Sequence, residues 1–262
     1  MTIYFKELRQ SRKAFLIWTI SIAAMMFLCI IIFPEMKTEM DNVSDVFAKM
    51  GKFTQAFGMD KLSFGELMGF YGIECGNVVG IGGGFFAALT GISVLADEEK
   101  GRTAEFLLTH PVSRTSVLTQ KLIFVLTRIF LLNAVVVLTS TVASALINEK
   151  FPAKEFLLLH IAYLIMQIEI SCICFGISAF IKRGGLGAGL GTALIMYCMN
   201  LICNMSEKVE FFKYITPYAY CDASNIISKS ELDAKLIIVG MIISVVSVIT
   251  GYVKYIKKDI SA

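Results

Sequence analysis

The chain has 262 residues, of which 56% are hydrophobic and 17% are charged, and its mean hydropathy is +0.71. Soluble domains carry about 45–50% apolar and about 25% charged residues, so this composition excludes an ordinary soluble protein. The formal net charge is only +3, and we expect no nucleic-acid partner. We expect a single domain, residues 1–262, embedded in a lipid bilayer.

Six apolar runs are long enough to cross the hydrocarbon core of a bilayer, which takes about 20 residues of helix. Backbone groups inside a bilayer find no water, so such runs form helices or closed barrels, and the alternation typical of barrel strands is absent. The sequence therefore predicts an all-α integral membrane protein. The expected spans are approximately residues 14–33, 71–96, 122–147, 156–181, 185–203 and 236–253.

Lysine and arginine are unevenly divided between the two sides of these spans. If the N-terminus is cytoplasmic, that side carries fourteen basic and six acidic residues, whereas the other side carries ten basic and thirteen acidic residues. Cytoplasmic loops of membrane proteins carry an excess of basic residues. Both termini are therefore expected in the cytoplasm, in a multi-pass protein of the cell membrane.

The N-terminal segment, residues 1–13, mixes apolar and basic side chains and predicts a short helix in the headgroup region of the membrane. A secretory signal peptide also starts with a basic region. However, the apolar run that follows leads into Pro34-Glu35-Met36 rather than a small-x-small cleavage site, so a retained span is expected. Residues 35–66 have apolar positions at three- and four-residue spacing, which indicates a helix on the outer leaflet or, alternatively, a substrate lid.

Glycine recurs at every fourth position of the second span, and the fifth span has a similar row. A helix face without side chains lets another backbone approach closely, which is how helices associate in lipid. Since glycine costs about 1 kcal/mol per residue in an ordinary helix, the rows indicate a requirement for packing or motion. Packing within the chain, a dimer seam and a conduit that slides open all fit. The rows are Gly72, Gly76, Gly80 and Gly84, and Gly185 and Gly189.

Three polar residues are expected inside the membrane. Glu169 falls near the middle of the fourth span and Asn133 near the middle of the third, and Arg128 lies one or two turns closer to the cytoplasm. An ionised acid at that depth costs roughly 2.5–3.5 kcal/mol, so Glu169 is expected to be protonated, paired or in contact with water. The three form either a structural hydrogen-bonded group or a contact for substrate or protons. Glu74, close to the outer end of its span, is expected to be hydrated.

Motifs for cofactors and catalysis are missing. The glycine-rich runs 80–84 and 184–192 contain neither GxGxxG nor a P-loop lysine, so no cofactor is expected to bind this chain. No spacing of histidine, cysteine or carboxylate indicates a metal site or a catalytic group, and we expect no enzyme activity in this chain. Of the seven cysteines, Cys203 and Cys221 are the pair expected on the outer side, and a disulfide between them stays open.

Residues 205–235, on the expected outer side, are rich in aromatic side chains. Aromatic rings with a polar tip favour the membrane interface. This segment therefore predicts a short helix or a re-entrant hairpin that dips into the outer leaflet.

Residues 97–121 form the largest polar stretch on the expected cytoplasmic side. Gly101 supplies a turn, residues 103–109 predict a short helix, and Pro111 ends it. Ser113 then caps the helix that continues into the third span. Such a short helix below the membrane suits docking in a groove on a partner, although a solvated connector has the same pattern.

This stretch resembles the signature between the second and third spans of type-2 ABC transporter permeases. The six spans, the cytoplasmic termini and the amphipathic N-terminal segment agree over nearly the whole chain, and Arg102 stands where small or polar residues are usual. The matching residues are Glu98-Glu99-x-Gly101-x-Thr103-x-Glu105-x-Leu107-Leu108-x-x-Pro111-Val112-Ser113-Arg114, together with Gln55-Ala56-Phe57-Gly58 and Gly69-Phe70.

The resemblance implies an exporter subunit that works with a separate ABC ATPase, which binds ATP and Mg²⁺, and with a second permease half, either an identical chain or a paralogue. It also implies that the loop forms a coupling helix on the ATPase, and that the second and fifth spans flank the pathway. The implied roles are polar docking for Glu98, Glu99, Arg102 and Glu105, apolar docking for Phe106 and Leu107, a turn at Gly101 and the start of the short helix at Thr103.

Two other functions stay open. An ion-coupled secondary transporter would use Glu169 or Glu74 as its coupling carboxylate, but inverted repeats and broken midplane helices are not evident. A membrane-embedded enzyme would need a reacting group that the sequence does not show. The residues do not indicate a substrate, and the direction of transport rests on the resemblance.

Overall fold

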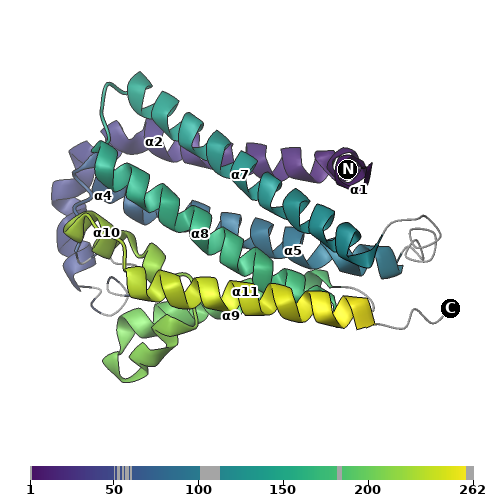
Figure 1. The fold of residues 1–262 in the computed structure, drawn as a ribbon. Helices are drawn as coiled ribbons and strands as arrows, with labels where there is room; N and C mark the ends of the chain where they lie inside the picture. The colour runs from purple at the N-terminus through teal and green to yellow at the C-terminus, as the bar shows by residue number, and fades with distance from the viewer. Residues whose placement is uncertain are drawn as a thin grey trace.

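The computed structural model describes residues 2–49, 51, 54, 56, 59, 61–100, 113–181 and 185–257. Within these residues the regular secondary structure is helical and no strand occurs (Figure 1), which confirms the all-α fold class. In chain order the elements are α1 (Thr2–Gln10), α2 (Arg12–Lys49), α4 (Leu67–Phe70), η1 (Tyr71–Cys75), η2 (Val78–Gly82), α5 (Gly83–Lys100), α7 (Arg114–Leu146), α8 (Ala153–Ser178), α9 (Leu186–Met205), η3 (Glu207–Tyr214), η4 (Ala219–Cys221), α10 (Ala223–Lys229) and α11 (Ala234–Lys257).

Six helical stretches of the described chain are long and apolar enough to cross a membrane, as the hydropathy pattern predicts. The second of them joins α4, η1, η2 and α5. The third begins at Arg114 rather than near residue 122, because its first two turns are polar and hydropathy does not detect them. The stretches are Arg12–Thr38, Leu67–Leu95, Arg114–Leu146, Ala153–Ser178, Leu186–Met205 and Ala234–Lys257.

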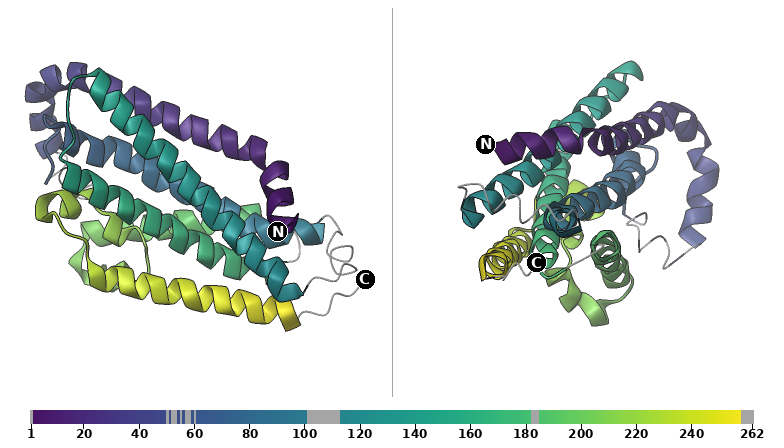
Figure 2. Two further views of the ribbon diagram at one scale, coloured as in Figure 1. Left: turned by 45° about the horizontal axis from the view of Figure 1, so that its top comes forward. Right: turned by 90° about the vertical axis from the view of Figure 1, so that its right-hand side faces the viewer.

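The first described helix and the end of the last one lie at the same end of the bundle. α1, the end of α5, the start of α7 and the end of α11 meet there (Figures 1 and 2), and we call this the loop end. The opposite end is called the cap end. This arrangement agrees with termini on a shared side of the membrane, and the assignment of that side to the cytoplasm stays a prediction.

The N-terminal helix α1 turns away from α2 at Ser11 and packs on the first part of α7 (Figure 2). The backbone amide of Tyr4 donates to Oε1 of Gln120 at 3.4 Å, and the Tyr4 hydroxyl donates to Oγ1 of Thr127 at 3.3 Å. These contacts hold α1 across the loop end of the bundle, in the place expected for an interfacial helix.

The central helix is α8, which packs against α5 and α11 and also contacts α7 (Figure 1). Gly91 of α5 faces the backbone of Ser171 on α8, and Gly176 of α8 faces the backbone of Ser247 on α11. At both positions an added Cβ would overlap the neighbouring backbone. Small residues at such crossings let membrane helices approach closely enough for direct backbone contact.

The spans differ in how much of their surface the chain itself covers. In the most apolar stretch of the second and fourth spans, 67% and 56% of the residues are buried, compared with 22% in the first, fifth and sixth. The exposed side chains of those three spans include Ile17, Ile195 and Ile242. Since lipid is as apolar as these side chains, such faces suit contact with lipid or with another membrane protein.

The first half of the second span departs from a regular α-helix. η1 and η2 are π-helical turns, and they lie in the segment that holds Gly72, Gly76 and Gly80. Such turns are rare and frequently occur at functional sites. The sequence predicted a plain helix here, because hydropathy reports the length of a span and not the register of its hydrogen bonds.

Residues 206–233 fold over the cap end of the bundle, and we call them the cap. The segment consists of η3, η4 and α10, three short helices where one short helix or a re-entrant hairpin was expected, and its position in the outer leaflet stays a prediction. Tyr218 and Tyr220 are buried, whereas Phe211 and Tyr214 are exposed, so only part of the aromatic set is free to lie at the membrane interface. The hydroxyl of Thr216 donates to the carbonyl oxygen of Met196 at 2.7 Å and fastens the cap to α9.

The helix expected over residues 35–66 is present in its first part, since α2 continues past Pro34 to Lys49. Lys37 on this extension forms an exposed ion pair with Glu149 at 2.9 Å. The side chains of residues 39–50 lie outside the described residues. The choice between a surface helix and a lid therefore stays open.

The crossing of α5 and α8 provides a test of this packing. Gly91→Val should lower the free energy of unfolding by at least about 1–3 kcal/mol, since the added side chain meets backbone atoms that cannot rotate away. Gly191→Val on α9 is the control, because an added Cβ there meets no atom within 4 Å. Thermal unfolding in detergent, followed by circular dichroism, measures both. Equal melting temperatures for the two variants would contradict the described crossing.

Candidate functional site

The predicted coupling loop, residues 97–121, is described only at its two ends. Glu98 and Glu99 belong to the last turn of α5, and the description resumes at Ser113. The docking roles proposed for the loop therefore stay predictions. The other expected docking residues, Gly101, Arg102, Thr103, Glu105, Phe106 and Leu107, lie outside the described residues.

The start of α7 lies where the sequence predicts a helix cap. Oγ of Ser113 accepts a hydrogen bond from the amide of Ser116 at 3.2 Å. Next to it, Nη1 of Arg114 donates to the carbonyl oxygen of Ile256 at 2.9 Å and to that of Tyr255 at 3.5 Å. The last carbonyls of a helix lack partners within that helix, and a cation there is stabilising. Arg114 thus joins the start of α7 to the end of α11.

Lys121 is a buried side chain that joins three helices. Its Nζ donates to Oε1 of Glu7 on α1 at 2.9 Å and to the carbonyl oxygen of Val94 on α5 at 2.6 Å. The side chain of Lys121 is 1% exposed, whereas that of Glu7 is 22% exposed. Because the ammonium group is out of water, it depends on these two acceptors.

Arg128 makes a third connection of this kind. Its Nη2 donates to the carbonyl oxygen of Ser11 at 3.2 Å, in the turn between α1 and α2, and its guanidinium lies 5.0 Å from the ring centroid of Phe15. Arg114, Lys121 and Arg128 recur at seven-residue intervals, about two helical turns apart. We call them the basic row. It ties α7 to α11, to α1 and α5, and to the α1–α2 turn.

The hydrogen-bonded group expected among Glu169, Asn133 and Arg128 is not formed. Oε2 of Glu169 accepts a hydrogen bond from the hydroxyl of Tyr220 in the cap at 2.7 Å. The carboxyl group also packs on α11, where a Cβ added at Gly240 would lie 2.8 Å from its Cδ. Glu169 therefore connects α8 with the cap and with α11, and Arg128 is engaged at the loop end.

Asn133 has a partner that the sequence analysis did not identify. Its Nδ2 donates to Oε1 of Gln167 on α8 at 2.8 Å, and both side chains are buried. Gln167 also packs against Gly83 of α5. The signal that would have found this pair is the presence of two amides at similar depth in neighbouring spans, since such groups hydrogen-bond across helices.

A second buried group was also missed. The Tyr71 hydroxyl lies 2.8 Å from Nε2 of His160 and 2.9 Å from Oγ of Ser140, so one phenol connects the second, third and fourth spans. The ring of Tyr71 also packs edge-on against Phe151 at 4.8 Å between centroids. This group anchors the first residue of η1, next to the glycine row.

The glycine row of the second span makes room for side chains of α8 and the cap. A Cβ added at Gly76 would lie 2.6 Å from the Tyr163 hydroxyl, and one at Gly72 would lie 2.9 Å from Cβ of Ala223. Packing within the chain, one of the three alternatives, thus accounts for this row. Its remaining members also face tyrosines, Gly80 facing Tyr163 and Tyr218 and Gly84 facing Tyr218.

The glycines of the fifth span behave differently from one another. Gly189 packs on α5, where an added Cβ would lie 2.8 Å from Cγ2 of Ile92, and Gly185 precedes the first turn of α9. In contrast, an added Cβ at Gly187 or Gly191 meets nothing within 4 Å. One face of α9 therefore packs within the chain, and the face with Gly187 and Gly191 is open.

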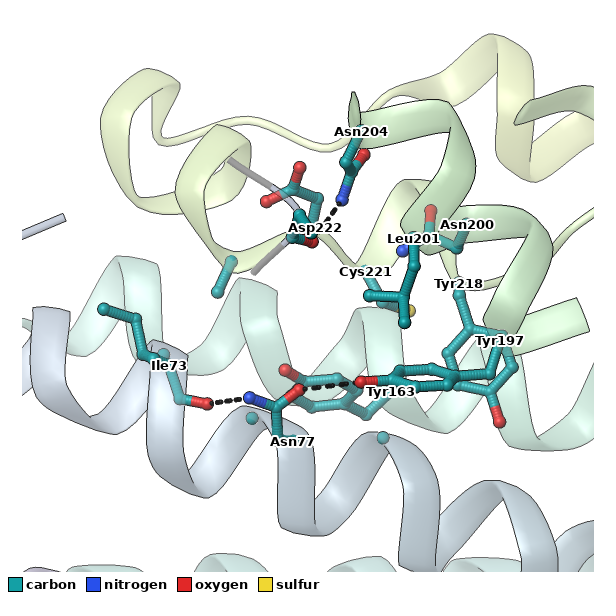
Figure 3. Close-up of a pocket in the computed structure, with 15 residues that line it drawn as sticks. Ile73, Asn77, Tyr163, Tyr197, Asn200, Leu201, Asn204, Tyr218, Cys221 and Asp222 are labelled. Carbon is teal, nitrogen blue, oxygen red and sulfur yellow. Dashed lines mark hydrogen bonds between the residues drawn. The ribbon is translucent and has the colours of Figure 1, made fainter. Parts of the chain in front are cut away.

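A pocket lies above the glycine row at the cap end (Figure 3), and we call it the cap pocket. It is bounded by the second span, α8, α9, the cap and Ala56, and its cavity volume is about 70 Å³. Pockets for drug-sized ligands typically measure about 300–1,000 Å³, so this cavity suits only a smaller group. Asn77 on its wall donates to the carbonyl oxygen of Ile73 at 2.8 Å and accepts a hydrogen bond from the Tyr197 hydroxyl at 3.4 Å.

All seven cysteines are free, so the Cys203–Cys221 disulfide that the sequence left open is not formed. Sγ of Cys203 donates instead to the carbonyl oxygen of Val209 at 3.4 Å. Burial raises the pKa of the Cys221 thiol well above its ordinary value, which keeps this thiol protonated and unreactive.

The same residues can be compared with known proteins. A sequence model of the family described as ABC-2 family transporter protein matches residues 1–260. The chain belongs to this family. As a member of the ABC-2 transporter family it is a transporter membrane subunit with several membrane-spanning helices. Neither the curated proteins nor the solved structures gave a match to this ABC-2 family chain.

The buried lysine provides a test of the loop-end junction in this ABC-2 subunit. Lys121→Met should speed hydrogen exchange over residues 2–10 and lower stability by about 1–3 kcal/mol, because Glu7 and the Val94 carbonyl lose their shared donor. Lys37→Met is the matched control, since the Lys37–Glu149 pair is exposed and such pairs contribute about 0–1 kcal/mol. Unchanged exchange in α1 of the first variant would contradict the junction.

A second test concerns the link between α8 and the cap. Tyr220→Phe should lower stability by about 1–3 kcal/mol, because the buried Glu169 carboxyl loses its hydrogen bond. Tyr214→Phe, in an exposed part of the cap, should leave the melting temperature unchanged. Thermal unfolding of both variants in the same detergent is the measurement, and similar values for the two would argue against the Glu169–Tyr220 bond.

Proposed function

We propose that this chain is the permease half of an ABC exporter in the cell membrane, and that a separate ATPase subunit binds ATP and Mg²⁺ and drives transport. Membership of the ABC-2 family carries the proposal. Coupling to an ATPase is supported by the pattern from Glu98 to Arg114, which resembles the ATPase-docking segment of type-2 permeases. The cytoplasmic position of this loop is supported by the excess of basic residues on its side.

The basic row supports a route from the loop into the bundle. α5 enters the loop at Lys100, and α7 leaves it at Ser113. Within two turns of that point, Arg114 holds α11 and Lys121 holds both α1 and α5. Coupling between distant sites travels through such packed and hydrogen-bonded elements. An ATPase that displaces the loop would therefore act on four helices together.

We further propose that the second and fifth spans face the transport pathway, which a second permease half completes. Whether that half is an identical chain or a paralogue is a matter for experiment. The open face of α9, with Gly187 and Gly191, suits close approach by another helix, and its exposed neighbours Leu194 and Ile195 are apolar. The open positions Gly187 and Gly191 on α9 support a pathway at this seam, whereas the row of the second span packs within the chain.

The secondary-transport alternative finds less support. The Glu169 carboxyl is held by Tyr220 and packs against Gly240, and it is not among the described residues that line the cap pocket. Glu74 is exposed on the surface of the second span. No observation on the described residues favours ion coupling, or an enzyme, over the ABC permease.

The deciding experiment is ATPase turnover in lipid nanodiscs that contain this chain and a candidate ABC ATPase from the same genome. Glu98→Lys and Gly101→Pro should each reduce the rate to that of the ATPase alone, since the first reverses a docking charge and the second removes the turn. Glu231→Lys, an exposed charge reversal in the cap, should leave the rate unchanged. If no ATPase co-purifies and the rate is indifferent to this chain, the proposal is wrong.

A further inference from the structure

We propose that the cap pocket is a binding site for a small organic ammonium cation. The pocket joins segments far apart in the sequence, since its walls come from the second span, α8, α9 and the cap (Figure 3). A role of the bound cation as the transported substrate would rest on the function proposed above. The binding itself requires neither the ATPase nor transport.

The space in this pocket is created by specific residues. Gly72, Gly76 and Gly80 line it on the second span, so the helix backbone itself forms the floor. Tyr163 of α8 lies over this floor, with its hydroxyl close to Gly76. The cavity volume of about 70 Å³ is enough for a small ammonium group.

Two buried polar atoms at the pocket have no protein partner in the described part of the chain. Asn200 of α9 is 9% exposed, its Oδ1 is unpaired, and its side chain points from α9 into the space beside Cys221 (Figure 3). Tyr218 is 5% exposed, and its unpaired hydroxyl lies against Gly84, which is not among the residues that line the pocket. Buried polar atoms in proteins nearly always have a hydrogen-bond partner. Asn200 therefore contributes a polar side chain to the α9 wall of the pocket.

The charge of the pocket favours a cation. Asp222 is the one charged residue among its described lining residues, and none of those is lysine, arginine or histidine. Its carboxylate is held in place at the start of α10, where Oδ1 accepts from the amide and hydroxyl of Ser224 at 2.9 and 2.6 Å, and Oδ2 accepts from Asn225 at 3.1 Å. A fixed carboxylate without a basic partner attracts positive charge.

The aromatic lining agrees with this sign of charge. Tyr163, Tyr197 and Tyr218 all line the pocket, and the rings of Tyr197 and Tyr218 meet edge-to-face with centroids 5.4 Å apart. The face of an aromatic ring is negative and attracts ammonium groups within about 6 Å. Burial also raises the pKa of the Tyr218 phenol, so this ring stays neutral and its hydroxyl keeps its proton.

Other ligand classes fit less well. An anion would meet the Asp222 carboxylate with no described basic residue to bind it. A lipid tail would place hydrocarbon against the Asp222 carboxylate and the Asn200 side chain of the lining. A primary ammonium group offers both the positive charge and the N–H donors that these residues lack.

The test is a binding titration of the full chain in maltoside micelles by calorimetry, with protein-free micelles as the blank. Benzylammonium is the probe. Benzyl alcohol has a similar shape and keeps a donor without the charge, and benzyltrimethylammonium keeps the charge without N–H donors. Saturable binding of benzylammonium that exceeds that of both analogues is expected, because charge and donor act together.

The variants locate the site. Asp222→Asn keeps the Oδ1 acceptor for the Ser224 amide but removes the charge, and it should weaken benzylammonium binding about tenfold while leaving benzyl alcohol unaffected. Asp233→Asn is the matched control, since Asp233 caps α11 in the same way, through the amides of Lys235 and Leu236, and does not line the pocket. Asn200→Leu should also weaken binding of the probe.

The outcomes separate clearly. Equal affinity for benzylammonium and benzyl alcohol, equal effects of Asp222→Asn and Asp233→Asn, or no binding above the blank would each overturn the proposal. Because the titration contains no ATPase, its failure leaves the coupling proposal untouched, and a failure of coupling leaves the titration untouched.

An ammonium group can come from a soluble amine or from a lipid headgroup. Competition distinguishes these sources. If vesicles of phosphatidylethanolamine displace the probe and vesicles of phosphatidylglycerol do not, the natural cation is a lipid headgroup. If neither lipid displaces the probe, it is a soluble amine.

Discussion

The direct contact of helix backbones around α8 is the constraint on which the rest of this bundle depends. Gly91 lets α5 touch α8 on one side, and Gly176 lets α8 touch α11 on the other. In lipid, no hydrophobic force draws helices together, so close packing and interhelical hydrogen bonds must hold them. These two crossings set the distances between three spans, and thereby fix which polar side chains meet across them.

The polar contacts follow from that spacing. Where helices are this close, little water enters, and a polar group left without a partner costs about 1–3 kcal/mol. The interior accordingly holds short, local pairs, such as Asn133 with Gln167 and Glu169 with Tyr220. The cap belongs to the same system, because Tyr220 reaches down from it to α8. At the loop end the polar contacts involve charged groups, and Lys121 donates hydrogen bonds to both a carboxylate and a carbonyl oxygen.

The sequence was sufficient for the spans, because about 20 apolar residues are needed for any crossing, whatever its neighbours. It predicted the depth of Glu169 and Asn133 but not their partners. Gln167 and Glu169 are separated by a rotation of about 200° around the axis of α8, so they face different neighbours. Direction around the axis depends on packing, which composition does not contain. For the same reason the glycine rows predicted close approach without naming Tyr163, and the cap pocket, built from four distant segments, had no signal in any one of them.

The second span takes part in both ends of the molecule. At the loop end, the Val94 carbonyl oxygen in its last turns accepts a hydrogen bond from Lys121. At the cap end, its glycines form the floor of the cap pocket. Between these points the chain is helical and is held to α8 at Gly91 and to α9 at Gly189, and the two π turns lie within the pocket floor itself. A helix carries displacement along its axis because its hydrogen bonds link each turn to the next. Any change of position at the loop must therefore reach the pocket floor, unless the π turns absorb it by a shift of register.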